Sequence, residues 1–165
     1  NNRKVLAALA EVCGGTDKMM DITMAIDKLD KIGLQKVKEE LLQRGLVTEQ
    51  IAVIEKYLSI EGTNAKKIAT LKNLIGENET GKKGIEEIEY ILNNVQSSVN
   101  SQLTTDFTLA RGLNYYTGTI FEVKAIKHKW AALVAAEDML TLPVYFVCPI
   151  FPAQAFLLVL TGSMM

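Results

Sequence analysis

The sequence predicts an α+β fold that is mostly helical and has one short pair of strands in its second half. Through the first 100 residues, apolar side chains recur every three or four positions, a spacing typical of amphipathic helices. Around residue 102 the period changes, and β-branched and aromatic residues become frequent. All three prolines lie beyond residue 142, so the C-terminal part is a different kind of sequence.

The helical part is a series of amphipathic segments separated by glycines, polar turns or capping residues. Gly14, Gly33 and Gly45 stand just after apolar stripes, where helices commonly end. Thr48 precedes a stripe and can cap the next turn by accepting from its amides. Residues 77–81 form a polar turn before the longest predicted helix. In chain order the stripes are Val5, Leu6, Leu9 and Val12; Ile22, Ile26 and Leu29; Val37, Leu41 and Leu42; Ile51, Ile54 and Leu58; Ile68, Leu71, Leu74 and Ile75; and Ile85, Ile88, Ile91, Leu92, Val95 and Val99.

Two strands are predicted after the helices, at about 103–110 and 117–125. Between them lies 111–116, and at 111–118 unlike functional groups come together. Arg111 offers a planar fork of donors that fits phosphate or carboxylate oxygens. Tyr115 and Tyr116 supply aromatic walls with hydroxyls, which suit a flat polar ring. By residue type alone, a glycine-bounded connection with a surface arginine and core tyrosines is the commoner arrangement.

Composition excludes some function classes. The net charge of −1 is too small to hold a nucleic acid by bulk attraction, so any such contact needs a local patch. Cys13 and Cys148 lie far apart without CxxC spacing, and His128 has no partner at ligand spacing. We therefore expect no metal site and no disulfide framework. A reducing, cytoplasmic setting is expected, because nothing at the start resembles a signal peptide.

The octapeptide Arg-Gly-Leu-Asn-Tyr-Tyr-Thr-Gly at 111–118, continuing through Thr-Ile-Phe-Glu-Val, resembles the histidine-specific signature of the class II histidyl-tRNA synthetases. The resemblance implies that Arg111 contacts the α-phosphate and carboxylate region during adenylate formation. It implies that Tyr115 and Tyr116 surround the substrate imidazole and that Gly112 and Leu113 line the same histidine pocket. The family often has aspartate where this chain has Asn114, so the expected site has no charge there.

The resemblance extends over about residues 1–126. Residues 1–6 resemble the stretch just after the family's second class-defining motif. Residues 25–33, with Val37, Glu40 and Leu41, resemble the start of its helical insertion domain. The implied architecture is a mostly helical insertion beside a fragment of the antiparallel class II sheet. The implied divisions are a catalytic-core helix at 1–15, the helical insertion at 16–81, and a core helix with the signature-bearing strand pair at 82–126.

The family activity implies the substrates and partners. Such an enzyme activates histidine with ATP and Mg²⁺ to histidyl-adenylate, transfers it to the cognate tRNA, acts as a homodimer and needs no membrane. In the family the insertion packs near the tRNA acceptor stem, so Lys66, Lys67 and Lys72 are candidate phosphate contacts. Interspersed glutamates favour a solvated helix face for any one of these lysines. Because other motifs of the enzyme are missing from this chain, we expect the isolated chain to be inactive.

The C-terminal segment suggests a frame change. Residues 139–165 carry no charge, yet Pro143, Pro149 and Pro152 interrupt them, so they would span a membrane poorly. Shifting the reading frame by one base permits a string containing Ser-Gly-Gly-Gly-Arg-Tyr, similar to the family's glycine-rich segment. Near the end it permits one similar to the third class-defining motif. We therefore predict that residues 127–165 are an out-of-frame, non-native tail.

Two alternatives come from other classes of protein. One is the synthetase-like regulatory subunit of ATP phosphoribosyltransferase, which binds histidine and is no ligase. That protein generally lacks the helical insertion, which is predicted here at 16–81. The other is an unrelated helical interaction module with an apolar C-terminal anchor, which leaves the octapeptide unexplained.

Overall fold

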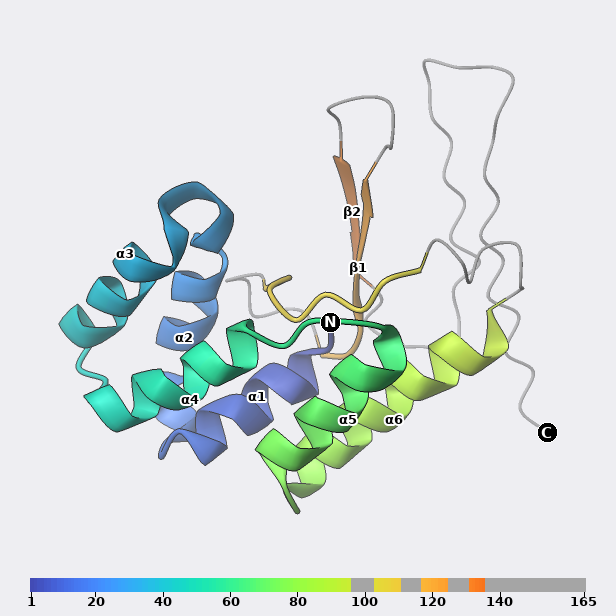
Figure 1. The fold of residues 1–165 in the computed structure, drawn as a ribbon, viewed down its shortest axis with the longest axis horizontal. Helices are drawn as coiled ribbons and strands as arrows, with labels where there is room; N and C mark the ends of the chain where they lie inside the picture. The colour runs from blue at the N-terminus through green and yellow to red at the C-terminus, as the bar shows by residue number, and fades with distance from the viewer. Residues whose placement is uncertain (96–102, 111–116, 125–130, 136–165) are drawn as a thin grey trace.

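The structure, a computed structural model, describes residues 1–95, 103–110, 117–124 and 131–135. A helical body precedes a two-stranded hairpin (Figure 1). The mostly helical character agrees with the prediction, whereas the second strand of the hairpin lies in the segment predicted to be a non-native tail. The elements are α1 (Arg3–Val12), a 3-10 turn at Thr16–Lys18, α2 (Met19–Ile26), α3 (Leu29–Gln43), α4 (Thr48–Leu58), α5 (Asn64–Ile75), α6 (Glu79–Asn94), β1 (Ile120–Lys124) and β2 (Ala131–Ala135).

Helix α1 is the centre of the helical body. Its side chains Val5, Leu6 and Leu9 are fully buried, and the helix packs against α6, α2 and α5. The contact with α6 is close because α6 has a glycine at the contact: a Cβ on Gly84 would lie 3.0 Å from the Cβ of Lys4. Removing this much apolar surface from water is the main term that stabilises the body.

Glycines mark several helix boundaries, as predicted. Gly14 and Gly45 follow α1 and α3 with φ of 101° and 83°, a left-handed region that favours glycine. Gly33 has φ 78° and interrupts the helical backbone within α3, so it produces a kink. The last helix ends earlier than its apolar stripe: α6 stops at Asn94, and Val95 is already extended.

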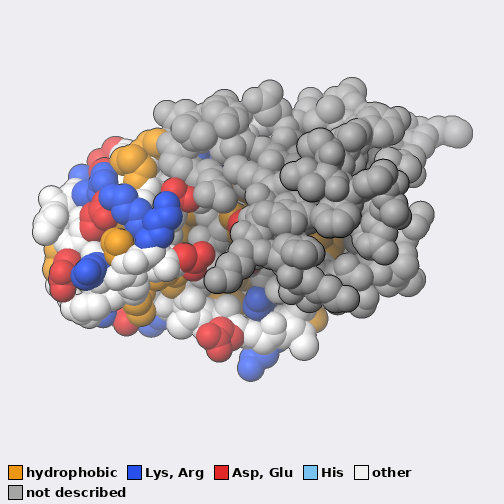
Figure 2. All heavy atoms as spheres, turned by 90° about the horizontal axis from the view of Figure 1, so that it is seen from above, with side chains coloured by type: hydrophobic (Ala, Val, Ile, Leu, Met, Phe, Trp, Pro, Cys, Tyr) orange, Lys and Arg blue, Asp and Glu red, His pale blue; other side chains and the backbone are white. Residues whose placement is uncertain are grey.

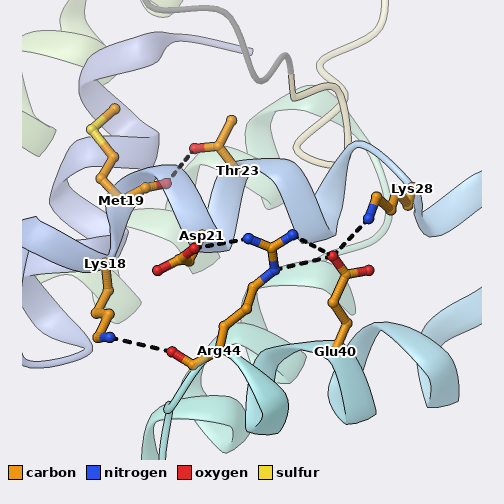
Figure 3. A network of polar contacts seen from close by, with 7 residues as sticks. All are labelled: Lys18, Met19, Asp21, Thr23, Lys28, Glu40 and Arg44. Carbon is orange, nitrogen blue, oxygen red and sulfur yellow. Dashed lines mark hydrogen bonds and ion pairs between the residues drawn. The ribbon is translucent and has the colours of Figure 1, made fainter.

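A charged surface covers the end of the molecule where α2 and α3 lie, with basic and acidic side chains intermixed (Figure 2). The guanidinium of Arg44 joins the two helices there: it donates to Asp21 at 2.8 Å and to Glu40 at 2.7 Å (Figure 3). Lys28 Nζ also donates to Glu40, at 2.7 Å. An open hollow of about 520 Å³ on this surface is lined by Lys28, Lys36, Glu39, Glu40, Gln43 and Arg44.

This network predicts an acid-sensitive stability. A hydrogen bond from Lys28, which is the largest cause, and one from Arg44 lower the pKa of the Glu40 carboxyl below its usual value. Such a group stabilises the fold above the unfolded pKa, about 4.3, and that contribution is lost as pH falls through the folded pKa. We expect Glu40→Gln to be less stable than the parent at neutral pH, with the difference closing in acid. Urea unfolding across the acid range measures this.

The control is Glu39→Gln, which removes the same charge from an exposed position on α3. Its stability relative to the parent is expected to change little with pH. A stability difference for Glu40→Gln that stays constant from neutral to acid pH would contradict the prediction.

The strand prediction is correct for one segment and wrong for the other. β1 lies within the predicted 117–125 strand and pairs antiparallel with β2, with Phe121 opposite Val134. Residues 103–110 form no strand. The reason is that carbonyl groups of this segment accept hydrogen bonds from distant side chains, namely Asn64, Lys67 and Asn1, instead of from a neighbouring strand.

Within the described residues, no helix is long and apolar enough to cross a membrane.

Candidate functional site

The described residues on both sides of 111–116 meet at the first three residues of the chain. On one side, Asn1 Nδ2 donates to the carbonyl oxygens of Phe107 at 3.0 Å and Leu109 at 2.8 Å. On the other side, the Arg3 amide donates to the Gly118 carbonyl at 2.8 Å, and the Ile120 amide donates to the Asn1 carbonyl at 2.8 Å. One short stretch of chain, through the Asn1 side chain and the backbone of Asn1 and Arg3, therefore holds the residues on both sides of 111–116.

Asn2 strengthens the second flank and begins α1. Its fully buried side chain accepts from the Lys4 amide at 2.9 Å, which caps the helix. Its Nδ2 donates to Thr119 Oγ1 at 3.1 Å and to Glu87 Oε2 at 2.6 Å. Lys4 pairs with the same Glu87 carboxylate, so α6 is joined to this point as well. The start of α1, the flank at 118–120 and α6 thus share one polar centre.

Tyr57 of α4 reaches the first flank from the helical body. Its side chain is fully buried, with its hydroxyl 3.1 Å from Asn1 Nδ2 and 3.4 Å from Asn1 Oδ1. Its ring lies against that of Phe107, with 5.7 Å between centroids. Burial raises the pKa of the Tyr57 hydroxyl well above its usual value, so the group remains a neutral hydrogen-bonding partner.

The beginning of the 103–110 segment is held by α5. Asn64 donates to the Leu103 carbonyl at 2.9 Å and accepts from the Thr105 amide at 2.8 Å. Lys67 Nζ donates to the Thr105 carbonyl at 2.7 Å. Side chains of α4 and α5, together with Asn1, therefore hold the 103–110 segment against the helical body.

The predicted site residues are placed only in part. Arg111, Gly112, Leu113, Tyr115 and Tyr116 lie outside the described residues. Lys66, Lys67 and Lys72 all lie on α5 and are not equivalent there. Lys67 binds the Thr105 carbonyl, whereas Lys66 and Lys72 are both exposed, and Lys72 pairs with Glu89 at 2.6 Å on the surface. Across the described part of the chain, no group of three or more His, Cys, Asp or Glu side chains could hold a metal ion.

Sequence reasoning missed Asn1, Tyr57 and Asn64 as residues that organise the site. Tyr57 adjoins the apolar stripe of its helix and has the sequence character of an ordinary core residue. Asn64 follows Thr63, whose side chain already caps the start of α5. The local sequence therefore gives no sign that Asn64 binds the 103–110 segment. Asn2 alone carries a local signal, because an asparagine just before an apolar helix is a typical N-cap.

Comparison with known proteins identifies the family to which the chain belongs. A family model described as Histidyl-tRNA synthetase matches residues 1–134, a range that includes the octapeptide and both of its described flanks. The chain belongs to the histidyl-tRNA synthetase family.

Named relatives support the same assignment. The chain is 54% identical over 127 residues to the histidine–tRNA ligase of Bacteroides fragilis and 50% identical to that of Porphyromonas gingivalis, covering 76% of this chain and 28% of each relative. The crystal structure of histidyl-tRNA synthetase from Nostoc sp. PCC 7120 matches 74% of this chain and 30% of that chain, with a TM-score of 0.62 and 32% identity. The chain thus spans about 28% of the length of these curated ligases. The alternative of a phosphoribosyltransferase regulatory subunit is not favoured.

Proposed function

We propose that this chain is a working segment of an enzyme that activates histidine with ATP and charges the cognate tRNA. The observation that carries the proposal is the match of residues 1–134 to the family model, together with ligase relatives about half identical in sequence. The enzyme as a whole would use ATP with Mg²⁺, histidine and tRNA, act as a homodimer and work in the cytoplasm.

The segment would contribute one side of the histidine pocket. Arg111 would hold the α-phosphate and carboxylate region, because a guanidinium presents two parallel donors to such oxygens. Tyr115 and Tyr116 would enclose the imidazole, with Gly112 and Leu113 lining the pocket. Adenylate formation depends mainly on positioning and on stabilising charge at the reacting oxygens, so fixed flanks around these residues support the assignment.

The proposed divisions are a core helix at 1–15, the insertion at 16–81 and the signature region at 82–126. On this division, exposed Lys66 is better suited to tRNA phosphates than Lys67 and Lys72, which bind within the chain. We also propose a frame change near residue 127. The family match, which continues to residue 134, does not place the change. The coding DNA decides it: a shifted frame that cannot encode the glycine-rich and arginine motifs would rule it out.

A hybrid enzyme tests the proposed function. Residues 1–126 replace the homologous segment of the Bacteroides fragilis ligase, and histidine-dependent ATP–pyrophosphate exchange and tRNA charging are measured. We expect the hybrid to perform both reactions and the 165-residue chain alone to perform neither. The unmodified ligase is the positive control. A folded hybrid that performs neither reaction, or exchange by the isolated chain above background, would contradict the proposal.

A further inference from the structure

We propose that Tyr57 and Asn1 are positioning residues for histidine binding, through which helix α4 sets the place of the segment that enters the signature. The inference rests on the proposed function. It concerns a link between two parts of the chain that are far apart in sequence: residue 57 in the predicted insertion and residues 107–109 before the signature.

The hydrogen count at Asn1 explains why Tyr57 matters. The Asn1 amide nitrogen carries two hydrogens and has three acceptors within reach. The carbonyls of Phe107 and Leu109 are the acceptors at 3.0 and 2.8 Å, and both are backbone groups that need a donor. The Tyr57 hydroxyl then serves as a donor to Asn1 Oδ1, which also accepts from the Asn2 amide at 2.8 Å. With both donors on Oδ1, the amide nitrogen points at the two carbonyls.

The second contact of Tyr57 acts on the same segment. Its ring packs against Phe107, whose side chain is buried, so the segment is held by a ring contact as well as by the bonded carbonyls. Leu109 is two residues before Arg111 in the chain. A small displacement at Leu109 therefore changes where the signature begins, and such displacements are costly when reacting groups must be precisely placed.

A purely structural role would also make Tyr57 important, so the chain needs a matched comparison. Asn64 provides it, because Asn64 holds the same segment by two hydrogen bonds of similar length. Those bonds lie at Leu103 and Thr105, further from Arg111 in the chain. Loss of either residue should loosen the segment, but only loss of Tyr57 or Asn1 should displace its end at the signature.

The experiment uses the hybrid ligase described above, with Tyr57→Phe, Asn1→Ala and Asn64→Ala measured separately. Tyr57→Phe removes one hydroxyl and keeps the ring against Phe107, so the fold is retained. We expect it to raise KM for histidine about 3- to 10-fold in pyrophosphate exchange, the range of one lost hydrogen bond. KM for ATP is expected to stay within about twofold, since the effect enters through the histidine side of the pocket.

The remaining variants decide between positioning and simple stability. Asn64→Ala is expected to lower Tm at least as much as Tyr57→Phe while leaving KM for histidine at the parental value. Asn1→Ala is expected to raise KM for histidine more than Tyr57→Phe does. A variant that carries both Tyr57→Phe and Asn1→Ala is expected to match Asn1→Ala alone, because both substitutions act through the Asn1 side-chain amide. Equal rises in KM for histidine with Tyr57→Phe and Asn64→Ala, or none with Tyr57→Phe, would overturn the inference. An inactive unsubstituted hybrid would instead count against the proposed function.

Discussion

Replacing Arg111 with alanine in the hybrid ligase is expected to lower kcat for ATP–pyrophosphate exchange by about 10²- to 10³-fold, the usual effect of removing one group that stabilises developing charge. Because the proposed contact is to phosphate and carboxylate oxygens, the loss should appear in kcat as well as in kcat/KM. Arg111→Lys is expected to recover only part of the activity, since a lysine offers a point charge without the guanidinium fork.

The matched control removes a positive charge elsewhere in residues 1–126 of the hybrid ligase. Lys31 is exposed on α3, so Lys31→Ala is expected to leave exchange unchanged. Both variants should retain the parental Tm, which separates catalysis from folding. A loss below about tenfold for Arg111→Ala would mean that the arginine of the signature does not have the role carried over from the family.

The helices were predictable because their signals are local. An apolar residue every three or four positions specifies a buried face, and most residues of those stripes, such as Ile22, Leu41 and Ile54, are buried. Val12 and Leu42 were placed in the stripes but are exposed, because each lies at the edge of its apolar face. Glycines after the stripes also mark real interruptions, since Gly14, Gly33 and Gly45 all have positive φ. These features depend on neighbours within one or two turns, so one sequence contains them completely.

The segment at 103–110 was predicted wrongly because its partners are remote. Its Phe107 and Leu109 fit the alternation of a strand, but their carbonyls bond to Asn1, more than 100 positions earlier in the chain. Alternation reports which side chains are buried and carries no information about which donors meet the backbone. The same reasoning explains why Tyr57 was missed: its hydroxyl becomes significant only when the fold brings Asn1 beside it.

The signature at 111–118 differs from the helices and from the 103–110 segment in how it was identified. Its identification came from resemblance to a family, which the comparisons confirm, whereas periodicity and composition alone favoured an ordinary turn. The described structure adds what the resemblance lacked, namely the means by which both flanks are fixed: Asn1, Asn2 and the Arg3 amide on one stretch of chain. The positions of the two described flanks thus depend on the correct packing of α1, which begins at that stretch.

Leu6→Ala is therefore expected to be among the most destabilising substitutions in the chain, with a loss of about 2–5 kcal/mol in the free energy of unfolding. Leu6 is 0% exposed on α1, the helix that packs against α6, α2 and α5, and truncation there leaves a cavity at the centre of the body. Val12→Ala is the control on the same helix: Val12 is 39% exposed, and alanine is the better helix former, so its cost is expected to stay within about 0.5 kcal/mol. Urea unfolding of the full chain, with unchanged m-values, measures both. If the two variants unfold at the same urea concentration, α1 is not the element on which the helical body and the flanks of the signature depend.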